Sequence, residues 1–230
     1  RLMQRSGEWH RLSDGAFDAA LGALVNLWGF GGGSPALPLH PEIMDALALS
    51  GWERVQLLDG ERVSRPAGVQ LDFGGIGKGY AVDRAVEILR QYGVSQALVN
   101  AGGEIAVLGG GWRIGIQHPR LENALLGSLE LKDMAVATSG DYQQFFELDG
   151  KRYHHILNPK TGYPATGIHG VTVIAPNCTD ADALATAIFV LGPDPGLALV
   201  ENLPGVEALI IDNSGKIYMS KGFNGYLSKQ

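Results

Sequence analysis

The sequence predicts an α+β fold, and two observations carry this prediction. Stretches with the alternating pattern of β-strands outnumber the helical stretches, and most of them follow one another in the middle of the chain. The regular alternation of strand and helix that is typical of a parallel α/β sheet is not seen. No linker rich in proline, serine or charge interrupts the sequence, so we interpret residues 1–230 as one domain.

The helices are predicted from the spacing of apolar residues and from the glycines and prolines around them. Apolar residues recur at three- and four-residue intervals through residues 16–28 and 77–92, and Gly29 and Gly93 end these stretches. A short helix begins at Pro41, because proline suits the first position of a helix. Two further helices are expected at residues 180–191 and 194–202.

The strands are predicted from short runs with a two-residue period. Residues 54–71 are expected to form a hairpin of short strands, with a turn at Asp59-Gly60. The other expected strands are residues 95–100, 104–108, 112–117, 126–131, 134–138, 143–148, 152–157, 170–175, 206–211 and 215–219.

Composition excludes several classes of protein. The formal net charge is −6 and no stripe of Lys and Arg is present, so we expect no nucleic-acid partner. Cys178 is the only cysteine, which rules out an internal disulfide. No apolar run in the sequence reaches the length of a membrane-spanning helix.

The glycine-rich segment at residues 72–83 joins a strand to a helix. Glycines before a helix allow backbone N–H groups to meet an anion such as phosphate, and Lys78 adds a positive charge there. The segment lacks the Ser or Thr that follows Gly-Lys in a Walker A loop, and it does not match the dinucleotide-binding glycine pattern. On local grounds, a tight turn with a solvated Lys78 is equally consistent.

Asp182 and Thr186 lie four residues apart, so they share one face of the helix expected at residues 180–191. A carboxylate and a hydroxyl are hard oxygen ligands that suit Mg²⁺ or Ca²⁺. Two alternatives remain open at this point. Asp182 could complete a capping box with Thr179 as the N-cap, and the Thr186 hydroxyl could bond back to the preceding turn.

His155 lies at the end of the strand expected at residues 152–157, where a histidine can accept a proton near neutral pH. For a single histidine without context, a plain surface position is the simpler interpretation. No second His, Cys or acidic residue forms a recognised metal-binding pattern with His155. A serine hydrolase is not favoured, because the sequence has no Gly-x-Ser-x-Gly elbow.

Taken together, four blocks of the sequence resemble the ApbE family of FAD:protein FMN transferases, in the family's order. They are residues 15–30, residues 72–83 continued by 99–104, residues 138–164, and residues 171–192. The resemblance implies an α+β fold whose antiparallel sheet is related to the T-fold. It also implies that Asp182, Thr186 and the backbone carbonyl of Gly75 bind the metal. The positions that it assigns to FAD binding are Ala16, Phe17, Asp18, Asp72, Lys78 and Leu157.

For catalysis, the resemblance implies roles for Asp182, through the metal, and for His155. His155 takes the place of the histidine in the family's His-x-x-Asp-Pro motif and is the candidate for proton transfer. Asn158 stands where the family usually has Asp. If that Asp orients or charges the histidine, the neutral amide of Asn158 would weaken this role. The family's usual N-terminal segment, which helps to close the flavin pocket, is expected to be missing from residues 1–230.

The activity that the resemblance implies is a magnesium-dependent transfer of FMN from FAD to a Ser or Thr hydroxyl of an acceptor flavoprotein, with release of AMP. Ca²⁺ is the alternative metal. The implied acceptors include subunits of membrane redox complexes, and the implied location is the bacterial periplasm or cell surface, with a lipid anchor outside this chain. Two rival functions remain: a metal-dependent FAD pyrophosphatase, and a non-catalytic FAD-binding protein.

Overall fold

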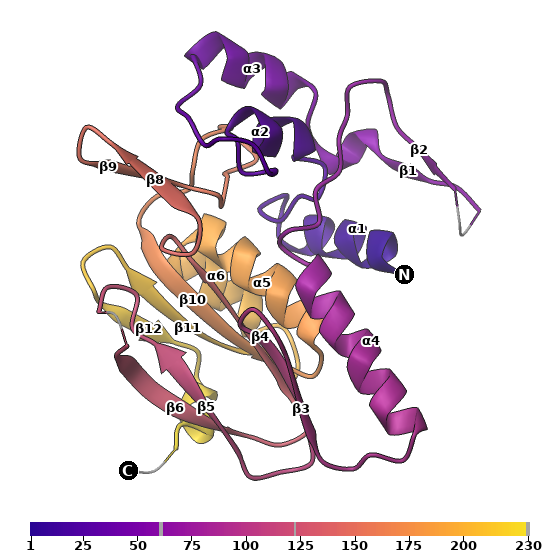
Figure 1. Cartoon of the computed structure of the whole chain (residues 1–230), viewed down its shortest axis with the longest axis vertical. Coiled ribbons are helices and arrows are strands. Elements are labelled where there is room, and N and C mark those ends of the chain that lie inside the picture. The colour runs from indigo at the N-terminus through magenta and orange to yellow at the C-terminus, as the bar shows by residue number, and fades with distance from the viewer. Residues whose placement is uncertain (60–61, 122, 229–230) are drawn as a thin grey trace.

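An antiparallel sheet of six strands forms the centre of the computed structural model, which describes residues 1–59, 62–121 and 123–228 (Figure 1). Every neighbouring pair in this sheet is antiparallel. The strands are, in spatial order, β12 (Ile217–Met219), β11 (Glu207–Asp212), β10 (Ile168–Ala175), β7 (Ala135–Gly140), β4 (Glu104–Leu108) and β3 (Ala97–Ala101). The predicted α+β class with an antiparallel sheet is therefore confirmed.

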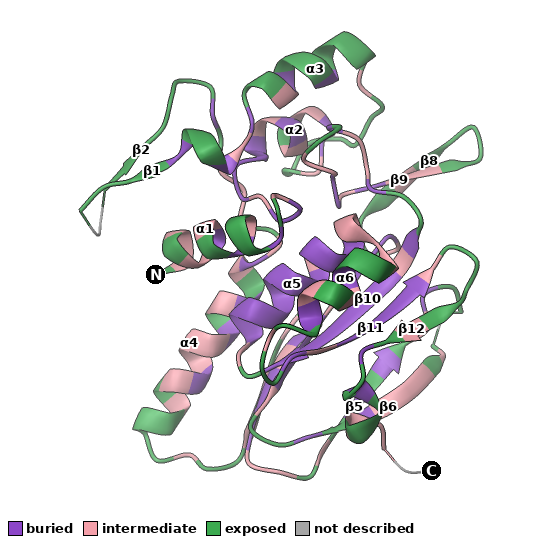
Figure 2. Cartoon of the chain, turned by 180° about the vertical axis from the view of Figure 1, so that it is seen from behind, coloured by how far each residue is buried: buried purple, intermediate pink, exposed green. Residues whose placement is uncertain are grey.

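Three helices cover one face of the sheet. The central helix, α5 (Cys178–Leu191), packs against β7 and β10, and Figure 2 shows it buried along most of its length. Next to it, α4 (Gly77–Gln91) packs against β3 and β4, and α6 (Pro193–Val200) packs against β11. Alternate strand residues such as Ala137 and Val173 join α5 in the main core, as the two-residue period of a strand requires.

A small hairpin covers the opposite face. It consists of β5 (Trp112–Gln117) and β6 (Leu125–Leu131), with the short helix η2 (Phe223–Tyr226) beside it. The second core contains Val136, Ile174 and the buried ring of Phe223. The strand neighbours of Val136 and Ile174 point the other way and face α5. The sheet is thus apolar on both faces.

The remaining elements gather beyond one end of the sheet, as Figure 1 shows. They are α1 (Leu2–Leu12), α2 (Gly22–Leu27), α3 (His40–Ala48), η1 (Trp52–Arg54), β1 (Gln56–Leu57), β2 (Val63–Ser64), β8 (Phe145–Leu148) and β9 (Lys151–His154). An aromatic cluster holds this part together. Trp28 stacks on Tyr153 with ring centroids 5.8 Å apart, and its indole N–H donates to the Gly162 carbonyl at 2.9 Å.

Most expected elements are confirmed within one to three residues, but the first helix is mostly wrong. Only Gly22–Leu27 of the expected helix at residues 16–28 is helical. Asp18 explains the difference, because its carboxylate accepts the Ala20 backbone N–H at 2.7 Å and so replaces a helical acceptor. The Gly22 N–H donates to the carbonyl of Gln70, across the chain, at 3.0 Å. Residues 16–21 therefore form an irregular segment, which we call the wall. The helix α1, which precedes the wall, was not predicted.

Two smaller differences concern strands. The strand expected at residues 152–157 ends at His154, because the Ile156 N–H donates to the His154 ring at 3.3 Å instead of to a neighbouring strand. β1 and β2 pair as the predicted hairpin, although Gly60 of the predicted turn lies outside the described residues. Among the described residues, none of the helices has both the length and the apolar character needed to cross a membrane.

His154 is a buried histidine of the core, held neutral by its contacts. Its Nε2–H donates to the Ala165 carbonyl at 2.9 Å, while its Nδ1 accepts the Ile156 N–H, so the ring carries a single proton. Its ring packs edge-on against Phe189, with centroids 5.3 Å apart. Burial lowers the pKa of His154 from 6.5 to about 4.

This lowered pKa predicts that the fold loses stability in mild acid. The unfolded chain takes up a proton at His154 below pH 6.5 whereas the folded chain resists until about pH 4, so the unfolding free energy falls across that window. The expected loss from His154 is roughly 3 kcal/mol. Denaturant titrations at several pH values should show this slope reduced in His154→Gln and kept in His40→Gln, a change at an exposed histidine of α3. Equal slopes in all three proteins would contradict the assignment.

Candidate functional site

A cavity of about 320 Å³ lies where the first turns of α4 and α5 meet the irregular wall at residues 16–21 and the segment after β9. The structure brings every predicted site residue to this cavity. Its lining includes Ala16, Phe17, Asp18, Asp72, Gly75, Lys78, His155, Leu157, Asp182 and Thr186. These residues come from four separate parts of the sequence, so their convergence is a property of the fold.

The crossing of α4 over α5 forms the floor of the site. The Gly79 N–H in the first turn of α4 donates to Asp182 Oδ2 on α5 at 2.9 Å. A side chain at Gly79 would place a Cβ 2.3 Å from the Cys178 carbonyl oxygen, so only glycine allows this approach. Asp83, one turn further along α4, accepts the N–H groups of Cys178 and Thr179 at 2.8 Å each.

The start of α5 differs from the capping-box alternative. The N-cap is Asn177, whose side-chain oxygen accepts the Asp180 N–H at 2.9 Å. Thr179 lies inside the helix and donates its hydroxyl to Asp83 instead. The alternative that Asp182 completes a capping box with Thr179 is therefore wrong, because Asn177 already supplies the cap.

Asp182 faces the cavity as a buried carboxylate, with 3% of the residue exposed. The pKa of Asp182 is raised to about 7, mainly by burial and further by the negative charge of Glu104, while the Gly79 N–H and Lys78 act to lower it. A carboxylate in this position is costly to ionise unless a cation compensates its charge.

Thr186 lies one turn beyond Asp182 and faces the glycine-rich turn. Its hydroxyl is 3.3 Å from the Ser139 hydroxyl, and no bond to the preceding turn of α5 is found among the described residues. A Cβ at Gly75 would lie 2.9 Å from Thr186 Oγ1, so the backbone of this turn runs directly against the hydroxyl. Asp182, Thr186 and the Gly75 backbone thus offer hard oxygen donors in one corner, which is a donor set that fits Mg²⁺ or Ca²⁺.

Lys78 is not simply solvated, because its ammonium lies 2.5 Å from Glu104 Oε1. Glu104 is only 2% exposed and also lines the cavity. Its other oxygen, Oε2, is buried and has no hydrogen-bond partner among the described residues. A buried oxygen without a partner is rare in folded proteins, so this atom indicates a place for a bound group. Glu104 was not among the predicted site residues, although it ends one of the family's sequence blocks.

His155 lines the cavity on the side of the β8–β9 hairpin. Its Nδ1–H donates to the Gln144 carbonyl at 3.2 Å, which leaves Nε2 free to accept a proton. Burial is the main reason that the pKa of His155 is below 6.5. Asn158 does not touch this ring in the described hydrogen bonds. It accepts the Lys160 N–H at 2.8 Å and so serves its own turn.

Two of the predicted FAD-contacting acids also shape the wall. Asp72 accepts the Gly74 N–H at 2.9 Å and thereby sets the glycine-rich turn. Asp18 accepts two backbone N–H groups, from Ala20 at 2.7 Å and from Trp52 at 2.9 Å. Their backbone contacts account for part of the wall's shape, and their predicted contacts with FAD stay predictions.

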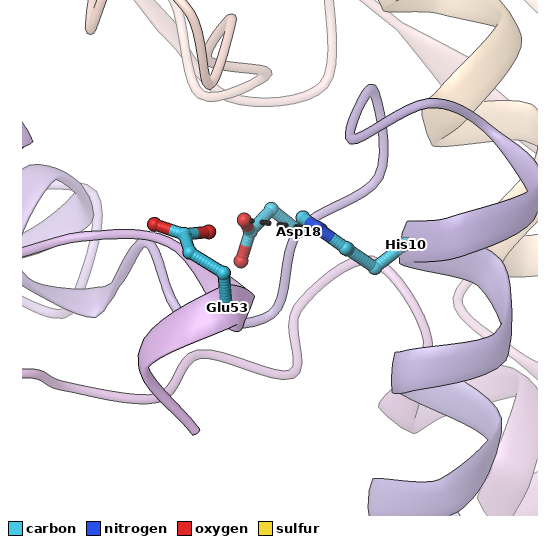
Figure 3. Close-up of side chains that lie close together, drawn as sticks. All are labelled: His10, Asp18 and Glu53. Atoms are coloured by element: carbon cyan, nitrogen blue, oxygen red, sulfur yellow. Dashed lines mark ion pairs between the residues drawn. The ribbon is translucent and has the colours of Figure 1, made fainter. Parts of the chain in front are cut away.

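Figure 3 shows Asp18 between His10 of α1 and Glu53 of η1. His10 Nδ1 is 3.2 Å from Asp18 Oδ2, and the neighbouring Asp18 carboxylate is the main reason that the pKa of His10 is raised. The Glu53 side chain is 66% exposed. Because Asp18 already accepts two N–H groups, we interpret this cluster as an ion pair that ties α1 to the wall.

Other lining residues escaped the sequence analysis because nothing local marks them. Ser139 lies beside Thr186, and Phe30, Gln143 and Gln144 form the side of the cavity near His155. All four fall inside the blocks that carry the family resemblance, which was the one available signal.

The chain matches known proteins over nearly its whole length. The family model for the ApbE family matches residues 1–210. The FAD:protein FMN transferase of Treponema pallidum is 40% identical over an alignment that covers 96% of this chain and 67% of that protein. The FAD:protein FMN transferase of Klebsiella pneumoniae is 38% identical, over 96% of this chain and 71% of that protein.

Solved structures agree with these sequence matches. The crystal structure of the ApbE protein from Thermotoga maritima superposes with a TM-score of 0.92 at 40% identity, over 99% of this chain and 77% of that one. The flavinyl transferase ApbE of Pseudomonas stutzeri, in its apo form, superposes with a TM-score of 0.86 at 39% identity, over 100% of this chain and 74% of that one. With the converging cavity, these matches establish that the chain belongs to the ApbE family.

Proposed function

We propose that this chain transfers FMN from FAD to a Ser or Thr hydroxyl of an acceptor protein, releases AMP, and requires a divalent cation, Mg²⁺ or alternatively Ca²⁺. The observation that carries the proposal is the convergence of every predicted flavin, metal and proton-transfer position on one cavity. The relatives' shared name, FAD:protein FMN transferase, supports the same reaction class.

The charge of the cavity supports the need for a cation. Lys78 is its one cationic Lys or Arg side chain among the described lining residues, and the acids there are Asp18, Asp72, Glu104 and Asp182. An FAD pyrophosphate adds further negative charge. Asp182, Thr186 and the Gly75 carbonyl would hold Mg²⁺, which usually takes few protein ligands and leaves room for phosphate oxygens. When bound, the ion would neutralise charge on the phosphates during transfer.

The glycine-rich turn and the start of α4 would hold the phosphates. The N-cap residue of α4, Ile76, makes no side-chain capping bond, and the positive dipole end of the helix lies beside Gly75 and Lys78. Glu104 keeps the Lys78 ammonium at the cavity through their ion pair. Lys78 would therefore be positioned to contact a phosphate oxygen without a large movement.

His155 would act as the base. The acceptor hydroxyl attacks the FMN-side phosphorus and forms a new P–O bond, the bond to the AMP phosphate breaks, and His155 Nε2 takes the hydroxyl proton. The neutral ring that burial favours is the form able to accept that proton. AMP leaves with the bridging oxygen, so atoms and charges balance.

Two rivals use the same cavity. A pyrophosphatase would place water where the acceptor hydroxyl reacts, and a flavin carrier would bind FAD without breaking it. Mass spectrometry of a threonine-containing acceptor protein, incubated with this chain, FAD and Mg²⁺, separates them. A mass gain equal to phosphoester-bound FMN supports the transferase, whereas free AMP without that gain supports the pyrophosphatase. Bound, intact FAD supports the carrier.

Asp182→Asn is expected to abolish transfer and to remove the stabilisation that Mg²⁺ gives the wild-type protein. The amide keeps an oxygen for the Gly79 N–H but loses the charge that attracts the cation. In EDTA the variant should unfold at the same or a higher temperature than wild type, because position 182 no longer buries a carboxylate. Thermal unfolding with and without Mg²⁺ gives a readout besides activity.

The matched control for Asp182→Asn is Asp194→Asn, at an exposed acid in the first turn of α6. It should keep both transfer and the shift in unfolding temperature with Mg²⁺. Full transfer by Asp182→Asn in a metal-titrated assay would refute the metal assignment.

His155→Gln is expected to lower the transfer rate by about 10²- to 10⁴-fold, the usual loss of a general base. In the wild type, the transfer rate should fall as the pH drops through the lowered pKa of His155, which is below 6.5, because the protonated ring cannot accept the hydroxyl proton. The variant should lack that acidic limb. Transfer rates measured across pH at saturating FAD test this, with His118→Gln, outside the cavity lining, as the control. An acidic limb that persists unchanged in His155→Gln would assign the base elsewhere.

We also propose that the protein works in the bacterial periplasm or at the cell surface, on acceptor subunits of membrane redox complexes. Immunodetection in fractionated cells that express the full-length gene would test this, and a purely cytoplasmic signal would count against it.

A further inference from the structure

A second hollow, of about 420 Å³, adjoins the cavity. Its two sides are the loop at residues 29–35, which follows α2, and residues 143–145, which lead into β8. We call it the groove. The groove shares Phe30, Gln143 and Gln144 with the lining of the cavity. The same three side chains therefore form a common wall, with the proposed FAD site on one side and the groove on the other.

The common wall also holds His155. The Gln144 carbonyl accepts the His155 Nδ1–H at 3.2 Å, and the Phe30 ring meets the imidazole edge-on with centroids 6.4 Å apart. The proposed base thus lies at the boundary between the two hollows. A hydroxyl that arrives through the groove would meet His155 before it meets the buried metal corner at Asp182.

The chemistry of the groove fits a polypeptide rather than a charged small molecule. Its described lining has no acidic or basic side chain and consists of glycines, Pro35, two amides and two phenylalanines. Arg152 stacks over the Phe145 ring at 4.0 Å, but its guanidinium is paired with Glu147 at 2.9 Å. Glycines leave backbone open to close approach, as an extended chain needs.

We propose that the groove binds the segment of the acceptor protein that carries the hydroxyl, in an extended conformation and with uncharged residues on either side of the Ser or Thr. The proposal rests on the proposed transferase function, because it names the partner of that same site. Extended segments gain affinity from backbone hydrogen bonds and specificity from the space left for their side chains.

Gly33 offers a clean way to block the groove. It is exposed, its φ is not in the left-handed region, and a Cβ there would have Gly29 Cα as its nearest neighbour at 3.5 Å, an ordinary contact. Gly33→Trp therefore fills the groove without straining the fold. Gly225→Trp is the matched control, because Gly225 is also exposed, has no φ restriction and has open space around its Cβ position in η2.

The experiment uses the whole chain with FAD and Mg²⁺. The probe is a displayed library of nonapeptides that have a fixed central threonine, sorted by covalent flavin fluorescence. We expect wild type to select uncharged neighbours of the threonine. For a selected peptide, Gly33→Trp should raise the KM at least about tenfold, equivalent to about 1.4 kcal/mol of binding. FAD affinity should stay unchanged, and Gly225→Trp should behave as wild type.

Four outcomes would overturn the proposal, and they are distinguishable. If wild type labels neither library peptides nor acceptor proteins, the transferase function itself fails. If wild type labels peptides and Gly33→Trp labels them with an unchanged KM, the function stands and the groove is not the acceptor site. If Gly33→Trp weakens FAD binding instead, the groove holds part of FAD. Selection of strongly acidic or basic peptides would likewise contradict the neutral lining.

Discussion

The close crossing of α4 over α5 is the contact on which the rest of the site depends. A β-carbon at Gly79 would lie 2.3 Å from the Cys178 carbonyl oxygen, so any side chain there would force the helices apart. The Gly79 N–H and the Asp83 carboxylate then lock the crossing by hydrogen bonds to α5. Once the crossing is set, the glycine-rich turn before α4 must run across the face of α5 that carries Asp182 and Thr186. The same short contact therefore decides the packing of the core and the geometry of the cavity.

The price of this arrangement is a carboxylate buried where its charge is poorly solvated. Asp182 has one backbone N–H as its partner in the described hydrogen bonds, and Glu104 adds a second negative charge nearby. Lys78 pairs with Glu104, which leaves Asp182 without a cationic partner of its own among the described residues. Stability alone would favour an apolar or amide side chain at this position. Retaining a carboxylate there is understandable if a bound cation provides the missing charge, and this links the electrostatics of the fold to the proposed reaction.

The sequence predicted most strands and helices, because their apolar periods match the two faces of one sheet and the buried stripe of α4. It failed where a polar side chain replaced a backbone acceptor. Asp18 disrupts the expected helix at residues 16–28 by binding the Ala20 N–H, and Asn177 provides the cap for which Thr179 was an open alternative. Local patterns pointed to Lys78, His155, Asp182 and Thr186, and the family blocks supplied the other site residues. Their shared cavity could not have been derived from spacing. Glu104 was missed because only the fold reveals that its Oε2 is buried without a partner.

The neighbouring histidines show how one physical cause can have two consequences. His154 and His155 follow each other at the end of β9, so the first turns into the core and the second lines the cavity. Burial lowers the pKa of both rings, and both are therefore neutral at pH 7. In His154 the neutral ring joins two backbone groups and supports the fold, whereas in His155 it leaves Nε2 able to accept a proton. Acid should consequently weaken the fold and the reaction together, and only variants that separate the two rings can show which loss comes first.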